Sequence, residues 1–152
     1  MLKPHRMTKV FFVVLCQLFA QSLKSFILPG EIPLKKKFVL IITHSTDDQD
    51  RANAAVGMAV SLLSEGADLI VFYIFEGALL AKKGVAETIH GRNFAPVSDL
   101  FPTLLEEKVP MYLCGACAKT YEIDEADLVD GVKIAHIPTI AAEMMDRETI
   151  TM

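Results

Sequence analysis

Two continuous apolar runs, joined by a segment of helical periodicity, constrain this chain more than any other feature. The runs are FVLIITH (38–44) and ADLIVFYIF (67–75), and both are rich in β-branched residues. Such runs are typical of strands that are buried on both faces. Between them, apolar residues recur at helical spacing from Ala52 to Leu63. A strand–helix–strand unit of this kind almost always crosses over right-handedly into a parallel sheet.

The same alternation continues to residue 152. Further strands are expected at 109–114, 132–137 and, at an edge, 148–152. Helices are expected at 98–108, from 115 to about 121, and from 138 to about 146. The stretch 76–94 has weaker periodicity and predicts one short helix plus a loop. The chain is therefore expected to form an α/β, three-layer αβα domain around a doubly wound, mainly parallel sheet of about five strands.

Charge divides the chain into a basic leader and an acidic domain. Residues 1–37 carry seven basic residues and one acid, for a net charge of +6, whereas the remaining 115 residues carry a net charge of −10. We therefore expect a leader and linker over 1–37 and a single domain over 38–152. An acidic domain with an overall pI of about 5.5 argues against a general nucleic-acid binder.

The first 22 residues have the three-part form of a secretory signal peptide. A basic stretch (1–9) precedes an apolar run (10–20), and Ala20-Gln21-Ser22 fits a small-x-small cleavage site. The apolar run is too short to span a bilayer, which needs about 20 residues, so no stable membrane span is expected. The alternative is an extension without a targeting role. The protein is then cytoplasmic, or exported if residues 1–22 are a working signal.

Cysteine usage narrows the chemistry. Three cysteines in 152 residues are too few for a disulfide scaffold. Two of them form the motif Cys114-Gly115-Ala116-Cys117, at the expected junction of a strand and a helix. Backbone N–H groups at such a junction favour the thiolate, which is the nucleophilic form of cysteine. We expect Cys114 to stand open beside Gly115, and Cys117 to lie deeper and to be less reactive.

Other interpretations of the pair remain. Free cysteines are often small core residues. A structural zinc site needs four ligands, and the chain has no second C-x-x-C motif to complete one, so no metal is expected. A thioredoxin motif would follow the first strand of a mixed sheet, whereas this motif follows the third strand of a parallel one.

Ligands of α/β proteins bind at the carboxyl ends of the strands, and three more candidates for substrate binding lie there. His44 follows the first strand and could act as a base or orient a substrate, although the Ser, Thr and Asp residues after it are typical of a helix cap. Gly77 follows the second strand, where it could instead serve turn geometry. Lys119 follows the cysteine pair and adds positive charge, and Gly115 completes the set of predicted binding residues.

Three sequence segments carry a resemblance to a known family. They are FVLIITHSTDDQDRANAAVGMA (38–59), GALLAKKGVAETI (77–89) and MYLCGACAKTYEIDEADLVDGVKIA (111–135). In order and spacing they resemble the DsrE/DsrF-like family, in the branch often called predicted peroxiredoxins, over about residues 37–152. Where the family often has Arg-Gly-Ile after the short helix, this chain has Tyr121-Glu122-Ile123.

The resemblance implies a flavodoxin-like fold without flavin or another cofactor, and a homo-oligomer that is a trimer or hexamer. Relatives of the TusBCD and DsrEFH type relay sulfur as a cysteine persulfide, and their active cysteine corresponds to Cys114. Cys117 matches a second cysteine of this branch. The partner so implied is a sulfur donor or acceptor protein.

Three functions follow. The first is a sulfurtransferase-like sulfur carrier that accepts sulfane sulfur as a persulfide on Cys114. The second is a thiol redox enzyme in which Cys114 attacks a peroxide or disulfide and Cys117 resolves the product. The third is a non-catalytic oligomeric binding subunit with buried cysteines. For the first function, we expect Cys114→Ser to abolish sulfur loading and Cys117→Ser to leave it intact.

Overall fold

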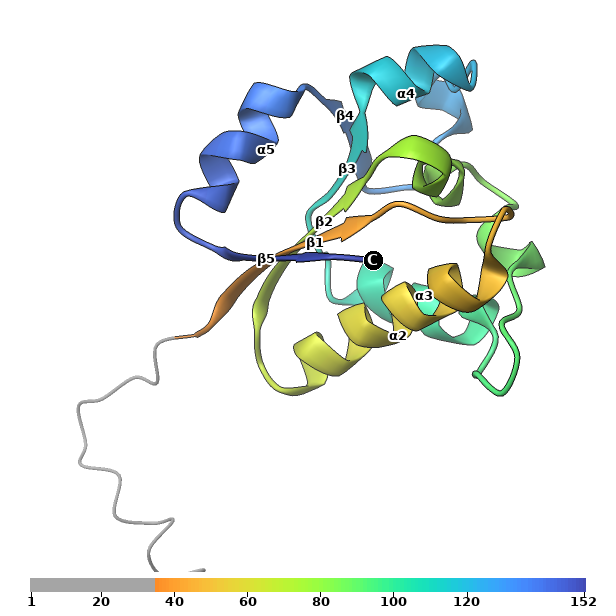
Figure 1. Ribbon diagram of the computed structural model, residues 1–152, viewed down its shortest axis with the longest axis horizontal. Helices are drawn as coiled ribbons and strands as arrows, with labels where there is room; N and C mark the ends of the chain where they lie inside the picture. Colours follow the sequence, from red (N-terminus) through yellow and green to blue (C-terminus); the bar gives the residue numbers. More distant parts are fainter. Residues whose placement is uncertain (1–34) are drawn as a thin grey trace, which may run out of the picture. The chain divides into compact units, whose positions relative to one another are not determined.

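The computed structural model describes residues 35–152, which form a five-stranded, wholly parallel sheet in the order β4-β3-β2-β1-β5. The strands are β1 (Lys37–Ile42), β2 (Asp68–Tyr73), β3 (Met111–Cys114), β4 (Val132–Ala135) and β5 (Glu148–Thr151). Helices cover both faces of the sheet (Figure 1). The predicted flavodoxin-like α/β class is confirmed.

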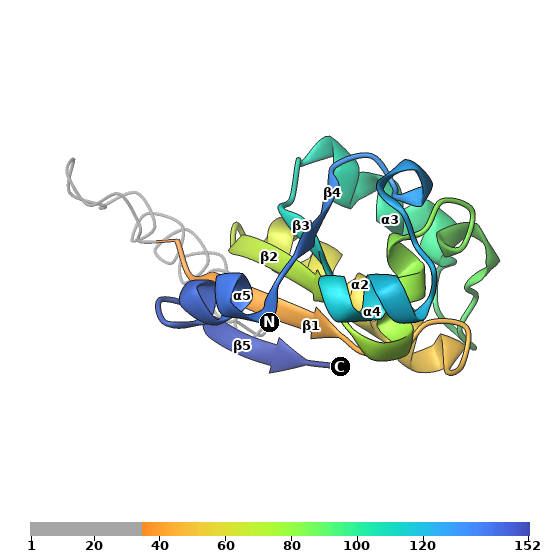
Figure 2. The same cartoon turned by 90° about the horizontal axis from the view of Figure 1, so that it is seen from above.

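Helices α2 (Gln49–Ser64) and α3 (Val97–Glu106) lie on one face of the sheet, and α5 (Ile137–Met144) lies on the other (Figures 1 and 2). The short helix α4 (Gly115–Thr120) follows β3 directly and contacts the 3-10 helix η1 (Phe75–Ala81). Two further 3-10 helices are η2 (Ala86–Thr88) and η3 (Glu125–Asp127).

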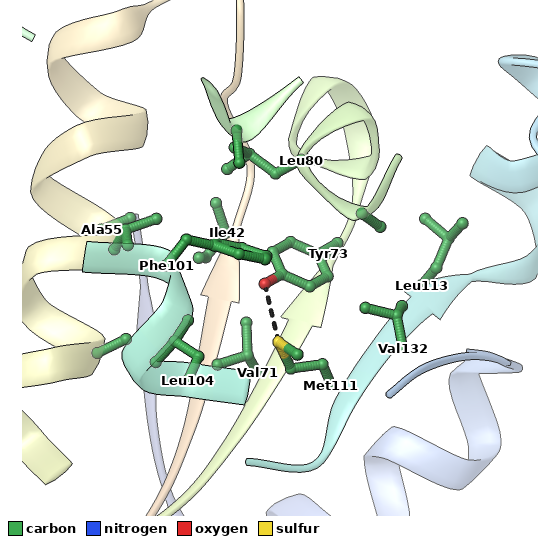
Figure 3. Packing of buried hydrophobic residues seen from close by; sticks show 14 of the residues in the cluster. Ile42, Ala55, Val71, Tyr73, Leu80, Phe101, Leu104, Met111, Leu113 and Val132 are labelled. Carbon is green, nitrogen blue, oxygen red and sulfur yellow. Dashed lines mark hydrogen bonds between the residues drawn. The ribbon is translucent and has the colours of Figure 1, made fainter. Parts of the chain in front are cut away.

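Most of the core lies between the sheet and the two helices α2 and α3. Figure 3 shows its centre, where Tyr73 is fully buried and its hydroxyl donates a hydrogen bond of 3.3 Å to the Met111 sulfur. Alternate residues of each strand point to the opposite face. There a smaller cluster packs under α5, comprising Val39, Ile70, Phe72, Cys114, Ala135 and Ile140.

Helix α2 begins and ends as its sequence indicates. The Asp48 carboxylate accepts the Arg51 N–H at 3.1 Å and caps the first turn. At the other end Gly66 has a φ of +80°, which glycine adopts without steric penalty. The Ala67 N–H then reaches back to the Leu62 carbonyl at 3.0 Å, as in a Schellman motif.

The loop of residues 90–95, which we call the clasped loop, is fixed by side chains of α2. Gln49, Asp50 and Asn53 each accept a backbone N–H from it, and Asn53 also donates to a loop carbonyl. These bonds run from His90 to Gln49 at 3.1 Å, from Gly91 to Asn53 at 2.8 Å, from Arg92 to Asp50 at 2.7 Å, and from Asn53 to Ala95 at 2.8 Å. Side chains thus supply the partners that this irregular backbone lacks within itself.

Strand β5 closes the sheet beside β1. Phe38 pairs with Glu148 and Leu40 with Ile150, so the first and last strands of the described domain are neighbours. Beyond the strand, the Thr43 amide and hydroxyl both donate to the Met152 carbonyl, across 109 residues of sequence. The expected edge strand at 148–152 is therefore present.

The expected elements differ from the structure mainly at their ends. The strands predicted at 38–44 and 67–75 end at Ile42 and Tyr73, because the chain turns at the sheet edge. After β2 it does so although Ile74 and Phe75 are still apolar. The stretch 76–94 holds the short 3-10 helices η1 and η2 rather than one helix. The candidate signal at 1–22 lies outside the described residues. Within residues 35–152, the helices fall short of the length and apolar character that a bilayer crossing requires.

Candidate functional site

Three segments meet at the carboxyl edge of the sheet, because parallel strands all end there. They are the loop after β1, the turn after β2, and α4 with the two cysteines after β3. Helix α4 and η1 lie side by side at this edge (Figures 1 and 2). The three segments that the sequence placed at this edge of the sheet therefore do lie next to one another.

The two cysteines are both free thiols, but their exposures reverse our expectation. Cys114 is the last residue of β3, and its side chain points into the smaller cluster under α5 with only 2% of the residue exposed. Cys117 lies one turn further on and is partly exposed. It packs against both hydrophobic clusters. The expectation of an open Cys114 and a deeper Cys117 was wrong, because strand alternation directs Cys114 to the face that α5 covers.

Gly115 does not open the Cys114 sulfur to solvent, as we had expected. A Cβ at this position would meet the His136 ring at 3.3 Å and the Ile134 side chain at 3.4 Å. The glycine therefore makes room for the side chains of Ile134 in β4 and of His136 just after it. Gly115 and the exposed Lys119 line a hollow of about 420 Å³ together with His136 and Glu122.

The sulfur of Cys117 accepts a hydrogen bond of 3.2 Å from the Phe75 backbone N–H. Phe75 has a φ of +54°, in the left-handed region that a phenylalanine rarely adopts. Residues 74–77, which we call the thiol turn, hold this geometry through two main-chain hydrogen bonds. Ile74 N–H donates to the Ile42 carbonyl at 3.1 Å, and Gly77 N–H donates to the Thr43 carbonyl at 3.0 Å.

Gly77 has a steric role in the thiol turn. A Cβ on Gly77 would stand 2.1 Å from the Ile42 carbonyl oxygen, far inside van der Waals contact. Only glycine lets η1 approach the end of β1 this closely. The structural alternative that the sequence left open for Gly77 is thus supported by a specific contact.

Electrostatics around Cys117 oppose ionisation in the resting state. Burial raises the pKa of the Cys117 thiol, the Phe75 N–H lowers it, and the neighbouring Cys114 thiol raises it again, with a net upward shift. The resting thiol is therefore mainly protonated at neutral pH.

Tyr121 stands near Cys117 and faces Glu76. Burial raises the pKa of the Tyr121 hydroxyl, and the facing Glu76 carboxylate raises it further, with smaller contributions from Cys117 and Asp47. The sequence reasoning did not assign Tyr121 or Glu76 to the site. Their spacing carried the signal: Tyr121 stands four residues after Cys117, one helical turn on, and Glu76 immediately precedes Gly77.

His44 is engaged at both ring nitrogens. Nδ1 lies 2.6 Å from the Asp47 carboxylate, and the Arg51 guanidinium lies 3.1 Å from Nε2. Both ring nitrogens of His44 therefore have a polar partner. Burial acts to raise the pKa of Asp47, but hydrogen bonds from Ser45 N–H and from His44 lower it below its usual range. His44 thus links Asp47 in this loop to Arg51 of α2, and its role toward a substrate stays a prediction.

The predicted site residues fall into three places. Cys114 and Cys117 are together, His44 lies in a separate hollow of about 570 Å³ with Arg51 and Phe94, and Lys119 lies in the hollow beside Gly115. Among residues 35–152, no three His, Cys, Asp or Glu side chains are arranged to hold a metal ion. The chemistry that the described residues offer is that of a thiol pair with a backbone donor.

Comparisons with known proteins agree with this architecture. Residues 36–151 match the model of the DsrE/DsrF-like family. The uncharacterized protein MJ0989 of Methanocaldococcus jannaschii is 27% identical over 117 residues, covering 75% of this chain and 96% of that protein. Among solved structures, the ychN protein from E. coli has a TM-score of 0.64 at 17% identity, covering 78% of this chain and 100% of that one. MTH1491 from Methanobacterium thermoautotrophicum has a TM-score of 0.59 at 15% identity, with the same coverage.

Proposed function

Because the chain belongs to the DsrE/DsrF-like family, which is related to sulfur-relay proteins, we propose that it is a sulfur carrier that accepts sulfane sulfur and holds it as a persulfide on Cys114. The observation that carries this proposal is the free thiol pair at the carboxyl edge of the sheet, with the Phe75 backbone N–H directed at the Cys117 sulfur. A persulfide needs no metal or cofactor to form, since a thiolate attacks the outer sulfur of a donor directly.

The burial of Cys114 suits a carrier. A persulfide is lost when a thiol or another reductant attacks its outer sulfur, and access limits that attack. With 2% of the residue exposed, Cys114 would keep a bound sulfur away from small solutes until a partner arrives. The implied partners are proteins that donate or accept sulfane sulfur, and the carrier acts between them in the manner of a sulfurtransferase.

A redox function is the second candidate, and the proximity of the two thiols favours it. The Cys114 thiol is close enough to Cys117 to raise the pKa of that thiol. A sulfenic acid formed on the partly exposed Cys117 could therefore be resolved by Cys114 to a disulfide with loss of water. This assignment of roles is the reverse of the one that the sequence suggested.

Mass spectrometry of the intact protein separates the two functions. Incubation with glutathione persulfide should add about 32 Da, the mass of one sulfur atom, to a sulfur carrier. Incubation with hydrogen peroxide should instead remove two hydrogens from a redox enzyme as the disulfide forms. No mass change with either reagent, together with no alkylation of Cys114 or Cys117 by iodoacetamide in the native protein, would point to a non-catalytic binding subunit.

We also propose that copies of the chain associate as a trimer or hexamer. Supporting this, Ile137 and Met145 at the two ends of α5 are 60% and 84% exposed, which is unusual for large apolar side chains. Light scattering at micromolar concentration tests the proposal. A monomer under these conditions would contradict it.

A further inference from the structure

We propose that sulfane sulfur enters through Cys117 and is then transferred to Cys114, with the Phe75 backbone N–H holding the Cys117 sulfur during both steps. This inference rests on the proposed function, because it assumes that the chain carries sulfane sulfur. It adds an order of events and assigns Phe75 as a positioning residue.

Exposure sets the order of events. A donor must bring its outer sulfur to about 3–3.5 Å from the attacking sulfur, in line with the bond that breaks. Cys117 is partly exposed, whereas Cys114 is 2% exposed within the smaller cluster, on the face of the sheet that α5 covers. Of the two thiols, Cys117 is therefore the one that a donor in solution reaches without displacing a helix.

Packing provides the route inward. Cys117 contacts both hydrophobic clusters, and Cys114 belongs to the smaller one. The two residues are separated by one helical turn and share that cluster. A sulfur atom attached to Cys117 is thus carried on a partly exposed side chain that packs against the cluster holding Cys114.

The first step forms one sulfur–sulfur bond and breaks another. Cys117, as the thiolate, attacks the outer sulfur of a persulfide donor, R–S–SH. The donor's S–S bond breaks, the electron pair leaves on the R–S sulfur, and the thiol proton given up by Cys117 ends on that leaving thiolate. The products are the Cys117 persulfide and R–SH, and no net oxidation or reduction occurs.

The second step repeats the exchange inside the protein. Cys114 gives up its proton and attacks the outer sulfur of the Cys117 persulfide. The bond between that sulfur and Cys117 breaks, the electron pair leaves on the Cys117 sulfur, and the proton from Cys114 ends there. The result is a Cys114 persulfide and a free Cys117 thiol, again without an external oxidant or reductant.

The Phe75 N–H matters because the Cys117 sulfur carries negative charge in both steps, before the attack in the first and after the bond breaks in the second. The Cys117 sulfur is the nucleophile in the first and the leaving group in the second. The Phe75 N–H already lies 3.2 Å from that sulfur, so it stabilises the charge each time without rearrangement. Positive φ at a phenylalanine is unfavourable and persists where the surrounding structure imposes it, here through the main-chain bonds of Ile74 and Gly77.

Variants of the full chain that each replace one cysteine of the pair test the order, and peptide mapping separates these two thiols from Cys16. Alanine is the appropriate replacement at Cys114, since a serine hydroxyl would lie unpaired in the apolar cluster. After exposure to glutathione persulfide, peptide mapping should locate the added sulfur on Cys114 in the unmodified chain and on Cys117 in Cys114→Ala. In Cys117→Ala, loading should slow by at least about tenfold, because a buried thiol reacts slowly with solutes. This pattern is the reverse of the one expected from the sequence, because Cys117 is the exposed thiol and Cys114 the buried one. The exposed Ala116→Ser on the same helix is the matched control and should load normally.

Each other outcome has a distinct meaning. If Cys117→Ala loads Cys114 as fast as the unmodified chain does, entry through Cys117 is wrong but the carrier function stands. If the sulfur stays on Cys117 in the unmodified chain, the transfer step is wrong. If no form of the protein gains sulfur, the proposed function itself fails. Thermal unfolding of each variant confirms that the comparison is between folded proteins.

The Phe75 contact has its own spectroscopic test. In a two-dimensional NMR spectrum, the Phe75 amide resonance should shift when the unmodified chain is titrated to the Cys117 thiolate. The same resonance should not follow that titration in Cys117→Ala. A Phe75 resonance that is unmoved by the ionisation of Cys117 would overturn the role assigned to this N–H.

Discussion

The clasped loop (90–95) and the thiol turn (74–77) both follow β2, yet they are stabilised in opposite ways. In the clasped loop, carboxylate and amide oxygens of α2 accept the backbone N–H groups of His90, Gly91 and Arg92. Its one non-glycine with positive φ is Asn93, a residue that tolerates this conformation. In this loop, the residue types therefore suit the backbone conformations and hydrogen bonds that the fold requires.

The thiol turn departs from this consistency at two points. Its N–H groups at Ile74 and Gly77 bond to main-chain oxygens, but that of Phe75 bonds to a sulfur, which is a weak acceptor. Phe75 also has positive φ, and so does Glu122 just after α4. Local rules are broken in natural proteins mainly at functional sites. The difference teaches that the clasped loop keeps to ordinary backbone preferences, whereas the thiol turn departs from them at Phe75, where it meets the Cys117 sulfur.

Gly77→Ala should have the largest effect, because the new Cβ would stand 2.1 Å from the Ile42 carbonyl oxygen. We expect the free energy of unfolding in urea to fall by about 3 kcal/mol or more, since main chain cannot move aside as a side chain can. The control is Gly57→Ala in the middle of α2, where a Cβ meets nothing within 4 Å. It should stabilise by up to about 1 kcal/mol through helix propensity. Equal effects at the two glycines would refute the steric role of Gly77.

Asn53→Ala should come second and should separate the two regions. It removes the acceptor of the buried Gly91 N–H and the donor to the Ala95 carbonyl, so unfolding should become easier by about 2 kcal/mol. In protein that remains folded, the rate of alkylation at Cys117 should not change. Gln49→Ala, at an exposed position of the same clasp, is the milder control. A marked change at Cys117 would mean that the two regions are coupled.

Glu122→Gly should stabilise the protein by about 1 kcal/mol, because a non-glycine residue is strained at positive φ. Glu122 ends α4 in the same way that Gly66 ends α2, with the next residue, Ile123, donating to the Ala118 carbonyl at 2.9 Å. Gly66→Ala is the converse change, in open space, and should destabilise by a similar amount. Thermal unfolding measures both. Loss of stability in Glu122→Gly would show that this side chain makes a contribution beyond its backbone conformation.

The smallest expected effect is a pH dependence in the clasped loop. Hydrogen bonds from the Arg92 side chain and then from its backbone N–H lower the pKa of Asp50, and both bonds are lost on unfolding. The stabilisation is therefore present above about pH 4, near the pKa of an unfolded Asp, and is lost as pH falls through the lower folded value. Asp50→Asn should make acid-induced loss of stability shallower over this range. An unchanged acid profile would show that the pair contributes nothing.

The sequence predicted the parts of the fold that depend on repeating patterns. The strands β1 and β2 are recognisable as continuous apolar runs. Gly66 marks the end of α2, because glycine suits the positive φ found there. Residues 76–94 were harder, since 3-10 turns leave no apolar periodicity to recognise. Their path depends on contacts with distant segments, such as that between Gly77 and the end of β1.

The candidate site, too, could be predicted only as far as local sequence patterns determine it. The spacing of Cys114 and Cys117 indicated a thiol pair, and strand order indicated its edge. Their exposures depend on which face α5 covers, and no local pattern encodes that. The bond between Phe75 and Cys117 joins residues 42 positions apart, so it follows only from the assembled sheet.

The pairing of β5 with β1 has a consequence for synthesis on the ribosome. A chain emerges from its amino end, so β1 is made early while its partner at residues 148–151 leaves the exit tunnel more than 100 residues later. Until then the outer edge of β1 presents unpaired backbone groups that other strands can capture. Chaperones that shield such edges should therefore matter most during translation. A chain truncated before residue 148 lacks β5, and we expect it to aggregate rather than to form a less stable domain.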